Sequence, residues 1–124
     1  MLFKRNRSEA PWRERDGLVS RVLLHEGDPP DTKLMVTWVD VEPGSAQCSH
    51  SHASEQVYVI LRGEGKMTVG GEERLVGEGD LIHIPPHIPH GIENTSDGVL
   101  TYVSAATPSA DWEAFYDSGP LRAR

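Results

Sequence analysis

Two histidines separated by a single residue, His50 and His52, are the clearest indication of metal chemistry in this sequence. Side chains on a β-strand alternate between its two faces, so His50 and His52 would point the same way and could bind one ion. A lone histidine pair is weak evidence, because a metal site needs further ligands. Glu55 and Gln56 follow shortly afterwards, directly before an apolar run. Glu55 would add an anion to the site and Gln56 a neutral amide, so the choice between them sets its charge.

Strand parity separates these two residues, because a shift of one position moves a side chain to the opposite face. One of them would therefore face the interior and the other would face outward. The apolar residues that follow, Val57 to Leu61, do not decide between them, since both faces of a strand can be apolar where a second copy covers the outer one. The residues alone leave this choice open.

Short apolar and β-branched runs, separated by turns rich in Gly, Pro, Asn and Asp, predict the elements that would position the histidines. The runs are residues 18–25, 33–41, 56–62, 66–69, 81–84 and 99–105. Two adjacent glycines, Gly70 and Gly71, can supply the positive φ of a tight hairpin turn. Regularly spaced short strands favour a β-sandwich or barrel, so we expect an all-β fold.

One helix is predicted near the C-terminus. Ser109 would be its N-cap, and Gly119 followed by Pro120 would end it. Three aromatic residues would share one face of this helix and pack on the barrel or close one of its ends: Trp112, Phe115 and Tyr116. We therefore expect an N-terminal arm at residues 1–16, a barrel at 17–107, and a C-terminal helix and tail at 108–124.

The length and charge of the chain limit the number of domains it can form and the partners it can bind. The 124 residues fit one domain, and a net charge of −7 argues against a nucleic-acid partner, whose phosphates would be repelled. No stretch is apolar enough for a signal peptide or a membrane span, which predicts a cytoplasmic protein without a membrane partner. The single cysteine, Cys48, excludes an internal disulfide. Cys48 has the parity of His50 and His52, so on a continuing strand it would face the same cavity.

The sequence resembles the cupin superfamily in two motifs. The first is a Gly, five residues, His-X-His, three or four residues, a Glu, six residues and a Gly. Here it reads Gly44, SAQCS, His50-Ser51-His52, ASE, Gln56, VYVILR and Gly63. The Glu position, counted back from Gly63, holds Gln56, so the resemblance favours Gln56 over Glu55 as the fourth ligand.

The second motif is a Gly, five residues, Pro-X-Gly, two residues, a His, three residues and an Asn. Here it reads Gly79, DLIHI, Pro85-Pro86-His87, IP, His90, GIE and Asn94. His87 replaces the last Gly of Pro-X-Gly, and would be either a solvated turn residue or a group at the rim of the pocket. The two motifs together imply a small single-domain cupin of the cupin 2 type, whose fold is a jelly-roll barrel or double-stranded β-helix.

The resemblance implies a divalent transition metal, Ni, Zn, Mn, Fe or Cu, held by His50, His52, Gln56 and His90. Neutral ligands would leave the full +2 charge uncompensated, which predicts a Lewis-acidic centre that favours an anionic oxygen ligand. In the alternative, Gln56 only forms hydrogen bonds near an ion held by the three histidines. The candidates for catalytic residues, all on predicted strands, are Tyr58, His83, Arg21 and Tyr102. Arg21 and Arg62 are also available cations for a substrate carboxylate.

The function that the resemblance implies is an enzyme acting on a small oxygenated molecule, by isomerisation or ring-opening of sugar acids such as unsaturated uronates. One alternative is dioxygenation of an enolisable substrate. A second is a non-catalytic ligand-binding or sensor module, and a third is a barrel that the metal only stabilises. A homodimer is also expected, because a second copy would cover the open sheet edge of a small barrel.

Overall fold

The computed structural model describes residues 2–29 and 31–109, which form a short 3-10 helix and ten strands. The elements are η1 (Arg7–Glu9), β1 (Trp12–Arg15), β2 (Leu18–Leu24), β3 (Met35–Val41), β4 (Ala46–His50), β5 (Glu55–Arg62), β6 (Glu64–Val69), β7 (Glu72–Gly77), β8 (Leu81–Ile84), β9 (His90–Asn94) and β10 (Leu100–Thr107). The predicted helix of residues 108–124 falls almost wholly outside the described residues. None of the described helical residues forms a segment long and apolar enough to cross a membrane.

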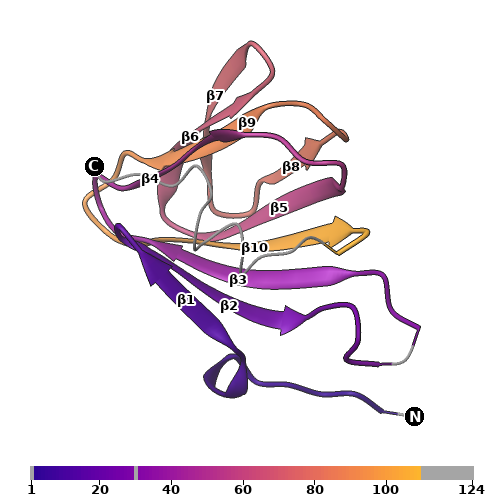
Figure 1. The fold of residues 1–124 in the computed structure, drawn as a ribbon. Helices are drawn as coiled ribbons and strands as arrows, with labels where there is room; N and C mark the ends of the chain where they lie inside the picture. Colours follow the sequence, from indigo (N-terminus) through magenta and orange to yellow (C-terminus); the bar gives the residue numbers. More distant parts are fainter. Residues whose placement is uncertain (1, 30, 110–124) are drawn as a thin grey trace.

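The strands form two antiparallel sheets, as the all-β jelly-roll prediction requires. The six-stranded sheet has the order β1-β2-β3-β10-β5-β8, and the four-stranded sheet has the order β4-β9-β6-β7. Figure 1 shows β1, β2, β3 and β10 in the lower part of the barrel and β4, β9, β6 and β7 in the upper part. The prediction of an all-β barrel is confirmed.

The inner faces of both sheets form the core. Burial along β3 alternates strictly, with Met35, Thr37, Val39 and Val41 buried and the residues between them half-buried. The core draws on both sheets and consists of Leu18, Val39, Val41, Tyr58, Ile60, Met67, Ile84, Ile92, Leu100 and Tyr102. Because each strand offers one apolar row to this interior, every second residue of a core strand is placed inside.

Four strands lie outside the predicted apolar runs: β1, β4, β7 and β9. Their sequences are too polar to stand out, and three of them, β1, β4 and β7, are edge strands with one free side. The hairpin predicted at Gly70 and Gly71 is confirmed, because β6 pairs with β7 from Val69 and Glu72 onward. Only Gly70 of the two has a positive φ, at 61°.

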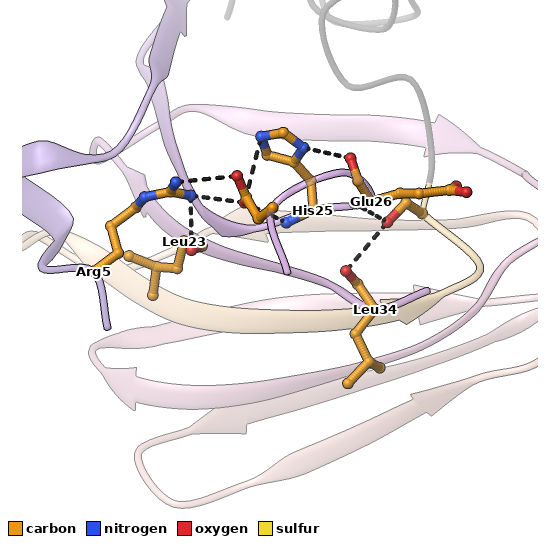
Figure 2. A network of polar contacts seen from close by, with 7 residues as sticks. Arg5, Leu23, His25, Glu26 and Leu34 are labelled. Carbon is orange, nitrogen blue, oxygen red and sulfur yellow. Dashed lines mark hydrogen bonds and ion pairs between the residues drawn. The ribbon is translucent and has the colours of Figure 1, made fainter. Parts of the chain in front are cut away.

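A polar network fastens the N-terminal segment to the β2–β3 loop. Arg5 donates two hydrogen bonds to the Asp28 carboxylate, at 2.8 and 3.1 Å, and a third to the carbonyl of Leu23 at 3.1 Å. The hydroxyl of Ser109 donates to the carbonyl of Leu34 at 3.2 Å, and the N–H of Glu26 donates to that hydroxyl at 3.0 Å. The network therefore joins residues before β1, the β2–β3 loop and the segment after β10 (Figure 2). The division of the chain at residues 16 and 107 remains a prediction, and β1 lies within the expected arm.

Candidate metal centre

Three histidines meet inside the barrel. His50 ends β4 and His90 begins β9, and the two are paired across these strands, while His52 follows in the loop after β4. Their possible ligand atoms all lie within 4.8 Å of one another. The ring centroid of His90 lies 4.3 Å from that of His50 and 4.8 Å from that of His52. This is the spacing of side chains that share one ion.

A bulge in β4 places His50 opposite His90. Gln47 pairs with Ile92 and His50 pairs with His90, so β4 holds one more residue than β9 over this interval. Gly91 faces the bulge, and a Cβ built on it would lie 2.7 Å from the carbonyl oxygen of Gln47. Only glycine permits this close approach of the two backbones.

The bulge also changes which side chains face the interior. Gln47 lines the cavity together with His50 and His52, whereas Cys48 does not line it. The expectation that Cys48 faces the cavity is therefore wrong, because the extra residue interrupts the strict alternation of the strand. Gln47 was not foreseen for the same reason, and a bulge leaves no clear signal in the sequence.

Each histidine is held by a hydrogen bond from Nδ1 to a backbone carbonyl. The accepting carbonyls belong to Cys48, Ser54 and Ile88, at 2.9, 3.0 and 3.0 Å from His50, His52 and His90 respectively. A carbonyl can only accept, so Nδ1 carries the proton and Nε2 keeps its lone pair. Histidine ligands of metals are usually oriented in this way.

Burial favours the neutral, metal-binding form of His50 and His90. It lowers the pKa of His50 to about 4, with smaller contributions from the neighbouring charges of His90 and His52. Burial, followed by the neighbouring His52, also lowers the pKa of His90. Among the described residues the buried Nε2 of His90 has no hydrogen-bond partner. A buried nitrogen of this kind is costly unless something satisfies it, and a metal ion would do so.

Gln56 points at this cluster from β5. Its Oε1 lies 2.9 Å from Nε2 of His52, and its amide nitrogen donates to the hydroxyl of Ser104. Two acceptors then face each other, since Nδ1 of His52 holds that ring's proton. Neighbouring ligands of one transition-metal ion, each about 2 Å from it, stand about 3 Å apart. The donor set therefore fits a metal bound by three imidazoles and an amide oxygen.

The neighbouring residue Glu55 points the opposite way. Its carboxylate lies 2.8 Å from Nε2 of His83 on the outer face of β5 and β8, and both side chains are more than half exposed, at 55% and 51%. His83 is paired across the strands with Val57 rather than Gln56, which places it on the outer face. His83 is therefore separated from the three histidines by the sheet.

The two arginines also lie on the outer face. Arg21 forms an ion pair with Asp40 at 3.1 Å, and both border an outer groove together with Arg62 and Trp38. The residues that flank Arg21 in β2, Ser20 and Val22, line the inner cavity instead. Neither guanidinium is thus in a position to meet a ligand inside the barrel.

Tyr58 and Tyr102 lie inside, next to the metal centre. Their rings stack with centroids 4.3 Å apart, and both line the cavity. Both hydroxyls donate to Oε1 of Gln47, at 2.8 and 3.3 Å. Burial raises the pKa of Tyr58 above that of an ordinary phenol. Tyr58 therefore stays protonated near neutral pH, and its proton is committed to Gln47.

His87 is the other departure from the cupin motif. Its φ is 66°, its side chain is exposed, and it does not line the cavity. Its backbone N–H donates to the carbonyl of His52 at 2.7 Å. His87 is thus a solvated turn residue whose backbone supports the loop that carries a metal-ligand candidate.

His50, His52 and Gln56 line a cavity of about 90 Å³. Four hydroxyl side chains contribute to its lining: Ser20, Thr37, Ser54 and Ser104. Four apolar side chains complete it: Val22, Met35, Val39 and Ala106. Among the described residues that line this cavity there is no aspartate, glutamate, lysine or arginine.

Comparison with known families decides the identity of this barrel. The model of the cupin domain family matches residues 37–105, which is more than half of the chain. The chain is a cupin. The matched region runs from β3 through β10 and contains all three histidines of the cluster. The structural neighbours agree, since a RmlC-like cupin from Shewanella frigidimarina superposes with a TM-score of 0.78 at 19% identity, over 91% of this cupin and 96% of that chain.

Curated relatives of this cupin are of more than one kind. An uncharacterized protein of Methanocaldococcus jannaschii is 37% identical over 99 residues, which cover 79% of each chain. The HTH-type transcriptional regulator PuuR of Escherichia coli is 33% identical over 92 residues, which cover 73% of this cupin and 49% of PuuR. H2HPP isomerase of Bacillus subtilis is 33% identical over 72 residues, which cover 54% of this cupin and 28% of that enzyme. This cupin thus spans about half or less of the two relatives whose names state a role.

Proposed function

We propose that this cupin binds a divalent transition metal through His50, His52, His90 and Gln56, and is an enzyme that acts on a small oxygenated molecule. The observation that supports the proposal most directly is the meeting of Nε2 of His52 and Oε1 of Gln56 at 2.9 Å. Both atoms are acceptors, so a shared cation explains their approach. The unsatisfied Nε2 of His90 supports the same proposal.

The metal would act as a Lewis acid that polarises a carbonyl or carboxylate oxygen. The chain's own residues would orient the substrate and hold its surroundings fixed. The carbonyls that accept from Nδ1 would hold the imidazoles in place, and Ser104 would hold the amide of Gln56. A hydroxyl such as that of Thr37 would form a hydrogen bond with an oxygen atom of the substrate.

Isomerisation or ring-opening of a sugar acid is the reaction we propose. A shell of four neutral ligands leaves the charge of the ion available to an anionic oxygen, and hydroxyl side chains suit a polyhydroxylated substrate. The likeness to an isomerase of Bacillus subtilis also supports this class of reaction. The anionic character of the ligand belongs to the proposal. None of the candidates Tyr58, Tyr102, His83 and Arg21 is proposed as the base, because the tyrosine hydroxyls are engaged by Gln47 and the other two face outward.

A non-catalytic sensor is the second candidate, and the likeness to the regulator PuuR favours it. In that case the same cavity would bind a ligand without converting it. The two functions make different predictions about turnover, whereas they make the same prediction about metal binding.

The experiment is to load the metal-free protein with Ni, Zn, Mn, Fe(II) or Cu one at a time and to test each form for conversion of unsaturated uronates and of enolisable diketones. Conversion of a uronate by the Zn or Ni form would support the isomerase. Oxygen consumption with a diketone only in the Fe form would replace it by a dioxygenase. Tight ligand binding without turnover by any form would support the sensor. Failure to bind any metal would overturn the proposal.

We also propose a homodimer and a cytoplasmic location. The outer face of β5 and β8 carries apolar side chains, among them Leu61 and Leu81, which are 38% and 62% exposed. A second copy would cover this face. We expect a dimer mass in light scattering for the wild type and a smaller mass for Leu81→Glu. The matched control is Leu75→Glu in β7 of the other sheet, where Leu75 is 78% exposed.

A further inference from the structure

We propose that the ligand of this cavity carries a single charged group, the one that binds the metal, and that the rest of the ligand is uncharged. This inference rests on the proposed metal site and narrows its substrate class. The chemical class is a short oxo- or hydroxy-monocarboxylate with an apolar or hydroxylated chain. Dicarboxylates and phosphorylated sugars would find no counter-charge among the described residues that line the cavity.

The wall opposite the histidines carries the inference. It is formed by the inner faces of β2, β3 and β10, where Val22 pairs with Thr37 and Thr37 pairs with Ser104. Met35 pairs with Ala106 in the next row. These side chains are buried, and they offer only methyl groups, a thioether and hydroxyls to a ligand. The wall can accept an apolar chain or donate to a hydroxyl, and it has no counter-charge to offer.

Two cations of the same sheet, Arg21 and Arg62, lie on its other side. Arg21 stands between two cavity-lining residues of β2, and alternation turns its guanidinium to Asp40 on the outer face. Arg62, at the end of β5, is exposed on that same face. A ligand inside the barrel therefore cannot reach either guanidinium without passing through the sheet.

A second ionised group on the ligand would lie among these neutral side chains. Burying a charge without a partner or a hydrogen-bonded counter-ion is strongly unfavourable. One carboxylate offsets only part of the metal's +2 charge, and the charge that remains lies at the histidines rather than at the wall that the ligand's far end would meet. The cavity therefore favours ligands with one ionised group over ligands with two, even though its metal attracts anions.

The test compares two five-carbon acids that differ only at the far end, 2-oxovalerate and 2-oxoglutarate. Binding to the zinc-loaded protein is measured by calorimetry in the same buffer. We expect 2-oxovalerate to bind at least about tenfold more tightly, because the distal carboxylate of 2-oxoglutarate finds no partner. Equal or tighter binding of 2-oxoglutarate, or binding of neither acid to the zinc-loaded protein, would overturn the inference and leave the metal site standing. Failure to bind zinc would overturn the proposed function and the inference together.

A charge added to the wall sharpens the test. Met35→Lys places an ammonium opposite the metal centre and keeps an unbranched side chain at a strand end, so we expect the preference to shift toward 2-oxoglutarate by about tenfold. Leu75→Lys adds the same charge in β7 of the other sheet, where Leu75 is 78% exposed, and is expected to leave the preference unchanged. Equal shifts in the two variants would mean that general attraction, not the cavity wall, sets the preference, and would overturn the inference. If Met35→Lys does not fold, the comparison of 2-oxovalerate with 2-oxoglutarate on the wild-type protein still tests the inference.

Discussion

Similar pairs of side chains have opposite environments on the two faces of the six-stranded sheet. On the inner face Gln56 approaches a cluster of three histidines, of which His90 is buried and the other two are half-buried, and whose rings are fixed by backbone carbonyls. On the outer face the next residue, Glu55, forms an exposed pair with His83. Both faces thus bring histidine together with an oxygen-bearing side chain, and only the inner one has the desolvated, pre-oriented lone pairs that a metal requires. The environment, and not the residue type, makes the site.

Removal of one inner histidine should have the largest effect. We expect His90→Ala to weaken zinc binding by at least about 100-fold, because three ligands remain of four and even the loss of a supporting contact costs up to that amount. His83→Ala removes a histidine from the outer face and should leave zinc binding unchanged. Chelator competition measures both. Comparable losses in the two variants would contradict the distinction between the faces.

A change in the backbone beside the cluster should have the next largest effect. In Gly91→Ala the new Cβ would meet the carbonyl oxygen of Gln47 at 2.7 Å, so the β4 bulge must shift. We expect a loss of about 1–3 kcal/mol in the free energy of unfolding and weaker zinc binding. Gly71→Ala is the matched control, because a Cβ there would meet nothing within 4 Å. Urea titration of both variants measures the difference, and equal stability would show that the close approach is not required.

Exchanges of charge on the two faces of β5 should have a moderate effect. Gln56→Glu adds an anion at the metal, so we expect zinc to bind about tenfold more tightly and any Lewis-acid turnover to fall. Glu55→Gln makes the reverse change one residue away and should alter neither property. Chelator competition and initial rates are the measurements. A response to Glu55→Gln but not to Gln56→Glu would reverse the assignment of the fourth ligand.

The smallest effect is expected for the pair formed by Arg5 and Asp28, which belongs to neither face of the six-stranded sheet. Arg5 lowers the pKa of Asp28 by hydrogen bonding to its carboxylate, so the pair stabilises the fold at neutral pH and ceases to do so as the pH falls through the pKa of Asp28. We expect Arg5→Ala to cost at most about 1 kcal/mol of unfolding free energy at pH 7 and to leave zinc affinity unchanged. Thermal unfolding at pH 7 and at pH 3 measures the change. The difference between variant and wild type should shrink at the lower pH.

His50 and His52 could be predicted from their local spacing, whereas His90 was predicted only through the resemblance to the second cupin motif. The His-X-His pair and His90 stand at fixed positions relative to glycines and prolines that form turns, such as Gly63, which has a φ of 88°. A Cβ at Gly63 would lie 2.7 Å from the carbonyl oxygen of Val99, so this position requires glycine. Such constraints act within a few residues and are therefore visible in the sequence. The same is true of the apolar runs that became core strands.

The tertiary structure decided which way each side chain points. Alternation places Glu55 and Gln56 on opposite faces of β5. Only packing against the second sheet determines which of the two faces the interior. The bulge in β4 brings Gln47 into the cavity and leaves Cys48 out, and it arises where Gly91 of another strand makes room. The outward placement of Arg21 and His83 follows from the same packing. The sequence thus determined the donor atoms and the strand pattern, whereas contacts between distant strands determined the charge of the cavity.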